Sequence, residues 1–66
     1  MKKRIKIDGM SCEHCVMHVE SALNELGAKH IHVNLLEGYA EADLDCPDDK
    51  IREAIYEAGY EVIEIE

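Results

Sequence analysis

The chain contains a weak internal repeat, and this repeat restricts the folds that it can adopt. Residues 19–28 align with residues 51–60, and the apolar positions 31 and 33 then align with positions 63 and 65. In both copies a helical pattern of apolar residues ends at a glycine, Gly27 or Gly59, and alternating apolar residues follow. The repeat therefore predicts a strand–helix–strand unit that occurs twice.

The spacing of apolar residues places six elements along the chain. Alternation is typical of a strand with one buried face, and apolar residues three and four apart are typical of an amphipathic helix. The pair Glu37-Gly38 is a tight-turn signal between two alternating stretches, which predicts a hairpin. The predicted elements are a strand at 2–8, a helix at 14–26, strands at 29–35 and 39–45, a helix at 47–58 and a strand at 60–66.

The residues at the ends of these elements give further expectations. Serine is a good helix cap, and we expect Ser11 to cap the first helix. Pro47 suits the first position of the second helix, because a proline there sacrifices no helical hydrogen bond. In the last strand we expect Ile63 and Ile65 to face inward.

Two split strand–helix–strand units in this order predict an α+β fold of the ferredoxin-like type. It is a βαββαβ sandwich, in which both helices cover one face of a four-stranded antiparallel sheet. Following the direction of the chain places the loop at Cys12 and the start of the last strand at Tyr60 at the same end of the sheet. Cys46 falls at the opposite end, roughly 20 Å away for strands of about seven residues.

Length and charge narrow the classes of protein. The chain of 66 residues predicts one domain spanning 1–66. Its formal net charge of −8 argues against nucleic acid or an anionic membrane as partner. No apolar run reaches the length of a membrane span or a signal peptide, so we expect no membrane insertion and a cytoplasmic protein. Three cysteines are an odd number, which argues against a disulfide framework.

The stretch GMSCEHC, residues 9–15, contains the side chains best suited to metal binding or redox chemistry. Cys12 and Cys15 stand two residues apart, just before a predicted helix. Two thiolates at this spacing can bind one soft metal ion or close on each other as a disulfide. The residues alone leave both possibilities open.

The histidines and the third cysteine are less informative. His14 could be a third ligand, could bridge a metal ion between two molecules, or could be a solvated side chain. His18 follows one helical turn later, at a spacing found in zinc sites, but we expect it to be a solvated helix residue. We expect His30 and His32 to point off the open sheet face. Cys46 is too distant to share an ion with the motif.

The sequence resembles a known family, the heavy-metal-associated domain. The resemblance covers nearly the whole chain and is specific, because the motif, the length and the element order agree. The family includes soluble bacterial copper chaperones and the N-terminal modules of copper-transporting P-type ATPases. The matching residues are GMSCEHC at 9–15, Val19-Glu20, Ala22-Leu23 and Gly59-Tyr60.

The resemblance implies a role for each site residue. Cys12 and Cys15 match the metal-binding thiolates, and Met10 matches a residue that packs under the loop without binding metal. Tyr60 matches an aromatic position beside the site, where it shields or hydrogen-bonds to the thiolates. Members that bind zinc or cadmium often have an acidic residue where this chain has Ser11, which favours copper.

The function implied is that of a soluble Cu(I)-binding metallochaperone, not an enzyme. It would pass copper by thiolate exchange to a partner such as the metal-binding domain of a copper-transporting ATPase. The motif fits a free chaperone and a transporter module alike, and the length favours the former. We expect a monomer without metal and leave a metal-bridged dimer open.

Two alternatives remain beside this interpretation. The first is the same fold with Hg, Zn or Cd as its metal. The second is a small dithiol–disulfide redox protein, against which the short chain and the distant Pro47 argue. An interaction module whose cysteines are incidental is the least favoured.

Overall fold

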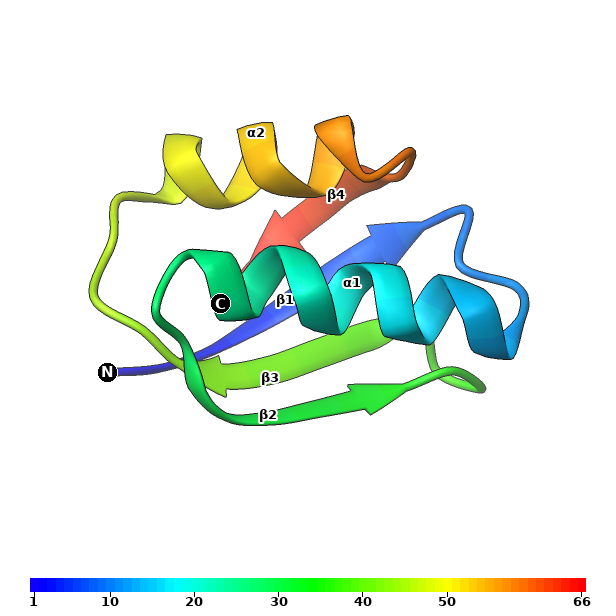
Figure 1. The fold of residues 1–66 in the computed structure, drawn as a ribbon, viewed down its shortest axis with the longest axis horizontal. Helices are drawn as coiled ribbons and strands as arrows, with labels where there is room; N and C mark the ends of the chain where they lie inside the picture. The colour runs from blue at the N-terminus through cyan, green and yellow to red at the C-terminus, as the bar shows by residue number, and fades with distance from the viewer.

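Six elements follow one another as strand, helix, strand, strand, helix and strand in the computed structural model, which describes residues 1–66 (Figure 1). This order confirms the predicted βαββαβ arrangement. The predicted bounds agree with the observed ones to within about two residues at each end. The elements are β1 Lys2–Asp8, α1 Glu13–Glu25, β2 Lys29–Asn34, β3 Tyr39–Asp43, α2 Asp48–Glu57 and β4 Glu61–Ile65.

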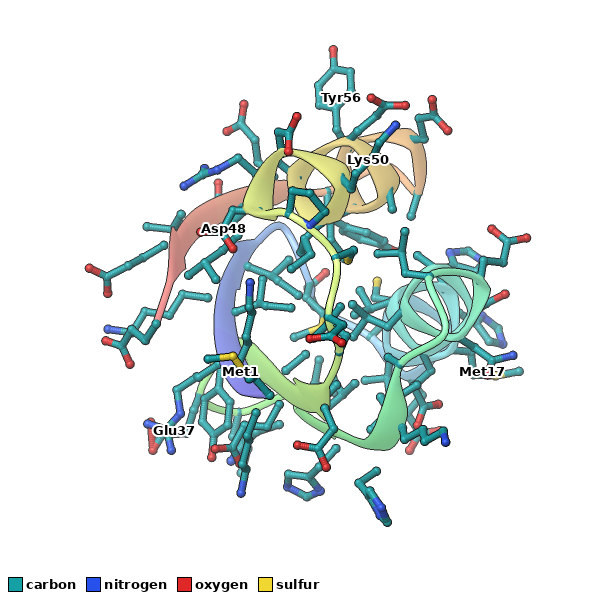
Figure 2. The ribbon with its side chains drawn as sticks, turned by 90° about the vertical axis from the view of Figure 1, so that its left-hand side faces the viewer. Met1, Met17, Glu37, Asp48, Lys50 and Tyr56 are labelled. Carbon is teal, nitrogen blue, oxygen red and sulfur yellow. The ribbon has the colours of Figure 1, made fainter.

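The four strands form one antiparallel sheet in the order β2-β3-β1-β4. Both helices lie on the same side of this sheet, with α1 against β2 and α2 against β4, and the helices contact each other (Figure 2). The fold is therefore the predicted ferredoxin-like sandwich. Neither helix combines the length and the apolar character that a membrane span requires.

The core lies between the sheet and the two helices. Its fully buried larger side chains come from β1, α1 and α2, and burying each of them contributes about 1.5–3 kcal/mol. Met17 and Tyr56, by contrast, project from the outer sides of the helices (Figure 2). The fully buried larger side chains are Ile5, Val19, Leu23, Ile51 and Ile55.

Each helix ends at its glycine through the same hydrogen-bonded motif. After α1, Gly27 has a φ of +84°, and the N–H groups of Gly27 and Ala28 donate to the carbonyls of Asn24 and Leu23. After α2, Gly59 has a φ of +102°, and the same pair of bonds follows it. This Schellman motif requires a left-handed residue, which glycine adopts without steric cost. The internal repeat is therefore a repeat of structure.

The inward face of β4 differs from the prediction. Ile65 pairs with Ile5 and Val62 pairs with Ile7, which leaves one extra residue in β4 between them. Such a bulge shifts the alternation by one position. Ile63, which we expected to face inward, is 63% exposed as a result, and Val62 takes the inward place. Ile65 is half-buried against the core, as expected.

A second bulge interrupts β2 between Lys29 and His32. Within it His30 adopts a positive φ of 55°, an uncommon conformation for a residue other than glycine. Both His30 and His32 are exposed, which agrees with their predicted positions away from the core. Between β3 and α2, Pro47 is the N-cap of α2 and not its first residue. The helix therefore begins one residue later than expected, at Asp48.

Candidate metal centre

The GMSCEHC stretch forms the connection from β1 to α1 and the first turn of α1, at one end of the sandwich (Figure 1). Gly9 follows β1 with a φ of +94°, and a Cβ at this position would lie 3.7 Å from Cδ1 of Tyr60. Met10 then turns into the core and is 8% exposed. Met10 thus belongs to the core cluster, whereas Ser11 and Cys12 lie at the surface.

Cys12 is the N-cap of α1. Its backbone is extended, with φ −150° and ψ 167°, and its sulfur accepts a hydrogen bond from the Cys15 N–H at 3.3 Å. The Cys12 carbonyl accepts from the same N–H and from that of Val16. The expectation that Ser11 would cap the helix is wrong, because helical conformation begins one residue later than a serine cap would require. A sulfur atom thus occupies the electropositive end of the helix.

Cys15 lies in the first turn of α1 and is buried, whereas Cys12 is exposed. The pKa of Cys15 is lowered from its ordinary value of 9.0 to about 7. The largest cause is a hydrogen bond from the Cys12 side chain, followed by one from the Tyr60 hydroxyl and one from the Ser11 backbone. Burial raises the pKa of Cys15, but by less than these hydrogen bonds lower it. The lowered pKa therefore increases the thiolate fraction of Cys15 near neutral pH.

Tyr60 reaches the loop from the other half of the repeat. It is the residue that closes the Schellman motif of α2, where its N–H donates to the Ile55 carbonyl at 3.1 Å. Its ring is half-buried beside Gly9. The Cys15 thiolate accepts a hydrogen bond from its hydroxyl, and this bond together with desolvation raises the pKa of Tyr60 to about 12. Figure 1 shows the α2–β4 turn and the β1–α1 loop at the same end, as the topology predicted.

His18 is a site residue that the sequence reasoning missed. It is exposed on α1, as expected, but its Nδ1 lies 3.2 Å from the Tyr60 hydroxyl. The two rings are 6.4 Å apart and inclined at 40°. Two features of the sequence bear on this contact. His18 stands one turn after Cys15, and the predicted topology places Tyr60 at the same end of the sheet as the loop. Neither feature alone indicates a contact.

The other candidates are not gathered at this loop. His14 is exposed, and nowhere in residues 1–66 are three or more histidine, cysteine or acidic side chains arranged to hold a metal ion. Cys46 lies in the connection from β3 to α2, at the far end of the sandwich (Figure 1). There Lys3 donates to the Cys46 carbonyl and forms an ion pair of 2.7 Å with Asp48. The donors that the fold brings together are thus the sulfurs of Cys12 and Cys15.

Comparison with known sequences is consistent with this arrangement. The sequence model of the heavy-metal-associated domain matches residues 4–61. The chain is 45% identical over 67 residues to the copper chaperone CopZ of Staphylococcus epidermidis, covering 92% of this chain and 96% of that protein. It is 44% identical over 69 residues to a mercuric reductase of Lysinibacillus sphaericus, covering 98% of this chain but 12% of the reductase.

Solved structures agree in fold. A CopZ metallochaperone superposes with a TM-score of 0.87 at 33% identity, covering 96% of this chain and 100% of that one. A copper-binding domain from HMA7, a P-type ATPase, superposes with a TM-score of 0.84 at 30% identity, covering 100% of this chain and 99% of that domain. The family model spans nearly all of the sandwich and includes both cysteines of the loop. The chain belongs to the heavy-metal-associated domain family.

Proposed function

We propose that this protein is a Cu(I) metallochaperone that binds its cargo through Cys12 and Cys15. The observation that supports this most is the pair of free sulfurs at the N-terminus of α1, one exposed and one with its pKa lowered to about 7. The family membership and the match to CopZ over most of both chains favour copper as the metal.

The donor set suits Cu(I). This ion is soft, prefers thiolate ligands, and is satisfied by few of them. A structural zinc site uses four ligands and has no open position. Two sulfurs on one loop, with Cys12 exposed, leave an approach for a further ligand. Such a site binds an ion and still admits a competing thiolate.

Copper transfer would be possible because a further ligand can reach the site on the side of the exposed Cys12 sulfur. A thiolate of the acceptor forms a Cu–S bond on the exposed side, and one Cu–S bond of this chain then breaks. Copper stays Cu(I), and each sulfur leaves as a thiolate, so no oxidant or reductant is needed. The similarity to the copper-binding domain of a P-type ATPase suggests that the acceptor is a domain of this kind.

The remaining parts of the proposal concern the protein as a whole. We propose that it acts as a binding module and not as an enzyme, that residues 1–66 fold as one heavy-metal-associated domain, and that it works in the cytoplasm. We further propose that it is monomeric without metal, and that a metal-bridged dimer forms only when copper is bound. No step of this function requires nucleic acid or insertion into a membrane.

One observation favours a second candidate metal. A mercuric reductase is 44% identical to nearly the whole chain, although the chain spans only a small part of that enzyme. Hg(II) is also soft and also accepts two thiolates. Competition between Cu(I) and Hg(II), and between Cu(I) and Zn(II) or Cd(II), under reducing conditions separates these candidates from the proposal.

Serine substitutions test the proposal directly. In a Cu(I) competition titration against a chelator, we expect Cys12→Ser and Cys15→Ser each to lose at least about 100-fold in affinity, more than the loss of an outer hydrogen-bond partner causes. Cys46→Ser, the matched control at the other end of the sandwich, should bind as the native chain does. His14→Ala should also retain affinity. Unchanged binding in both loop variants would refute the proposal.

A further inference from the structure

An open hollow lies beside the metal loop, on the side of α2 and β4. Its volume is about 500 Å³, and it is formed where β1 ends and where α2 turns into β4. Gly9 and Tyr60 line the hollow and also lie against each other at the start of the loop. A side chain seated in the hollow would therefore be next to a molecule docked at the loop. The lining residues are Asp8, Gly9, Tyr56, Gly59, Tyr60 and Glu61.

Two carboxylates of the hollow stand opposite each other without a cation. Asp8 and Glu61 are direct partners across the antiparallel pair of β1 and β4. Like charges in this arrangement destabilise a sheet. None of the ion pairs in the structure includes Asp8 or Glu61, and Lys6, two residues before Asp8, is paired with Glu64 and Glu66. The chain thus leaves this acidic pair to be neutralised from outside.

Two tyrosine rings accompany the carboxylates. Tyr56 projects from the outer side of α2 and is 71% exposed (Figure 2), whereas Tyr60 is half-buried beside Gly9. A Cβ at Gly59, between them in the chain, would meet no atom within 4 Å, so the space above the turn is open. Aromatic faces attract cations, most strongly where water is partly excluded. Rings and carboxylates together favour a cation that also has a flat or apolar part.

The donor set is better suited to an organic cation than to a metal ion. Calcium takes six to eight oxygen ligands and magnesium six, and no group of three or more candidate ligands exists in residues 1–66. A guanidinium is planar, so it can stack on a tyrosine and donate to carboxylates at once, whereas an ammonium is a compact point charge. Arg52 lines an adjoining hollow with Glu61 but forms no ion pair with it.

We infer that the hollow receives an arginine side chain of the protein that docks at the metal loop to accept the ion. The formal net charge of −8 favours a partner with basic side chains, and the hollow gives one of them a defined place. The identity of that partner as a metal acceptor rests on the proposed function. The preference of the hollow for a guanidinium does not, because none of its lining residues is a proposed metal ligand.

An NMR titration of the reduced apoprotein tests the preference. The probe is Nα-acetyl-arginine amide, added at constant ionic strength. We expect saturable shifts at Gly9, Gly59, Glu61 and the rings of Tyr56 and Tyr60. The citrulline analogue, which has the same shape without the charge, should cause no such shifts, and the lysine analogue should bind more weakly. The absence of saturable shifts with arginine, or equal binding of lysine, would overturn the inference.

Variants of the lining residues locate the binding. Glu61→Gln and Tyr56→Leu should each raise the dissociation constant of the arginine probe about 2- to 5-fold. Glu57→Gln removes the same charge from the groove between the helices and is the matched control, which should bind as the native chain does. The stability of Glu61→Gln should not fall, because the substitution relieves repulsion with Asp8. Equal weakening by Glu57→Gln, or a loss of stability in Glu61→Gln, would contradict the assignment.

Copper transfer tests the docking role. The acceptors are cysteine peptides in which glycine spacers of increasing length lead to one arginine or to citrulline. At least one arginine peptide should take Cu(I) from the native chain about 2- to 5-fold faster than its citrulline analogue, and Glu61→Gln should abolish the difference. No difference at any spacing would overturn the docking role.

The two proposals fail in different measurements. Glu61→Gln and Tyr56→Leu should keep the native Cu(I) affinity, whereas Cys12→Ser should lose copper and still bind the arginine probe. If the probe binds as expected but both cysteine variants retain copper, the proposed function fails and the hollow stands. If copper binding behaves as proposed but the probe does not bind, only the inference about the hollow fails.

Discussion

At the scale of single residues, the loop has two cysteines with different tasks. Cys12 is exposed and caps α1 with its sulfur, whereas Cys15 is buried and accepts hydrogen bonds from its surroundings. The donors to Cys15 come from Cys12, Tyr60 and the Ser11 backbone, and they lower its pKa without any metal ion. In the proposed function, the exposed Cys12 sulfur would be the point of contact for an acceptor thiolate.

The lowered pKa of Cys15 predicts a pH dependence of stability. The thiol titrates at about 7 in the folded chain and at 9.0 ordinarily. Between these values the unfolded chain binds more protons at Cys15, so its contribution to the free energy of unfolding grows with rising pH. This contribution is fully present above pH 9 and is lost as the pH falls through about 7.

Denaturant unfolding of the reduced apoprotein across this range measures the effect. The native chain should gain stability relative to Cys15→Ser as the pH rises from below 7 to above 9. Cys46→Ser serves as the control for loss of a cysteine, and it should follow the native curve. A constant difference between native chain and Cys15→Ser would contradict the assigned pKa.

At the scale of elements, the repeated Schellman motif explains why Tyr60 reaches the metal loop. Gly59 turns the chain out of α2 in a left-handed conformation, and Tyr60 then closes the motif beside Gly9. Gly27 performs the same turn after α1, at the opposite end of the sandwich (Figure 1). The two copies therefore provide a matched pair for experiment.

We predict that Gly59→Ala and Gly27→Ala destabilise the fold similarly but affect the site differently. Both glycines have a positive φ and open space where the alanine Cβ would lie, so each alanine should cost about 1–2 kcal/mol of backbone strain. Only Gly59→Ala should also move Tyr60 and speed Cu(I) loss. Equal release rates in the two variants would show that the α2–β4 turn does not position Tyr60.

The bulge in β4 makes a separate prediction. Because Ile63 is largely exposed, Ile63→Ala should change the free energy of unfolding by less than about 0.5 kcal/mol. Ile55→Ala, on the buried side of α2, should cost about 2–5 kcal/mol. Thermal or denaturant unfolding of the two variants compares them. A large loss in the free energy of unfolding for Ile63→Ala would contradict the bulged register and support a regular one.

The sequence predicted the elements but missed details that depend on tertiary pairing. Apolar periodicity and glycine stops located all six elements, because each signal is local. The exposure of Ile63 was missed because a bulge depends on how β4 pairs with β1. The cap at Cys12 was missed because cysteine is not among the usual capping residues. The contact between His18 and Tyr60 joins residues 42 positions apart, which no local pattern reveals.

At the scale of the whole molecule, a small sandwich holds a loop whose chemistry is largely at its surface. The buried larger side chains lie between the sheet and the helices, and Met10 links the loop to this core. The net charge of −8 favours partners with a basic face, which is a further property to seek in the acceptor. The proximity of Cys12 and Cys15 was predictable from the motif, whereas the lowered pKa of Cys15 depends on the fold.

The most direct test of the central claim is the metal content of protein purified without oxygen from copper-supplemented cells. We predict copper equimolar with the native chain, and almost none in a chain with both Cys12→Ser and Cys15→Ser. Cys46→Ser should retain the native content. Stoichiometric zinc or mercury in place of copper, or copper retained by the double variant, would contradict the account.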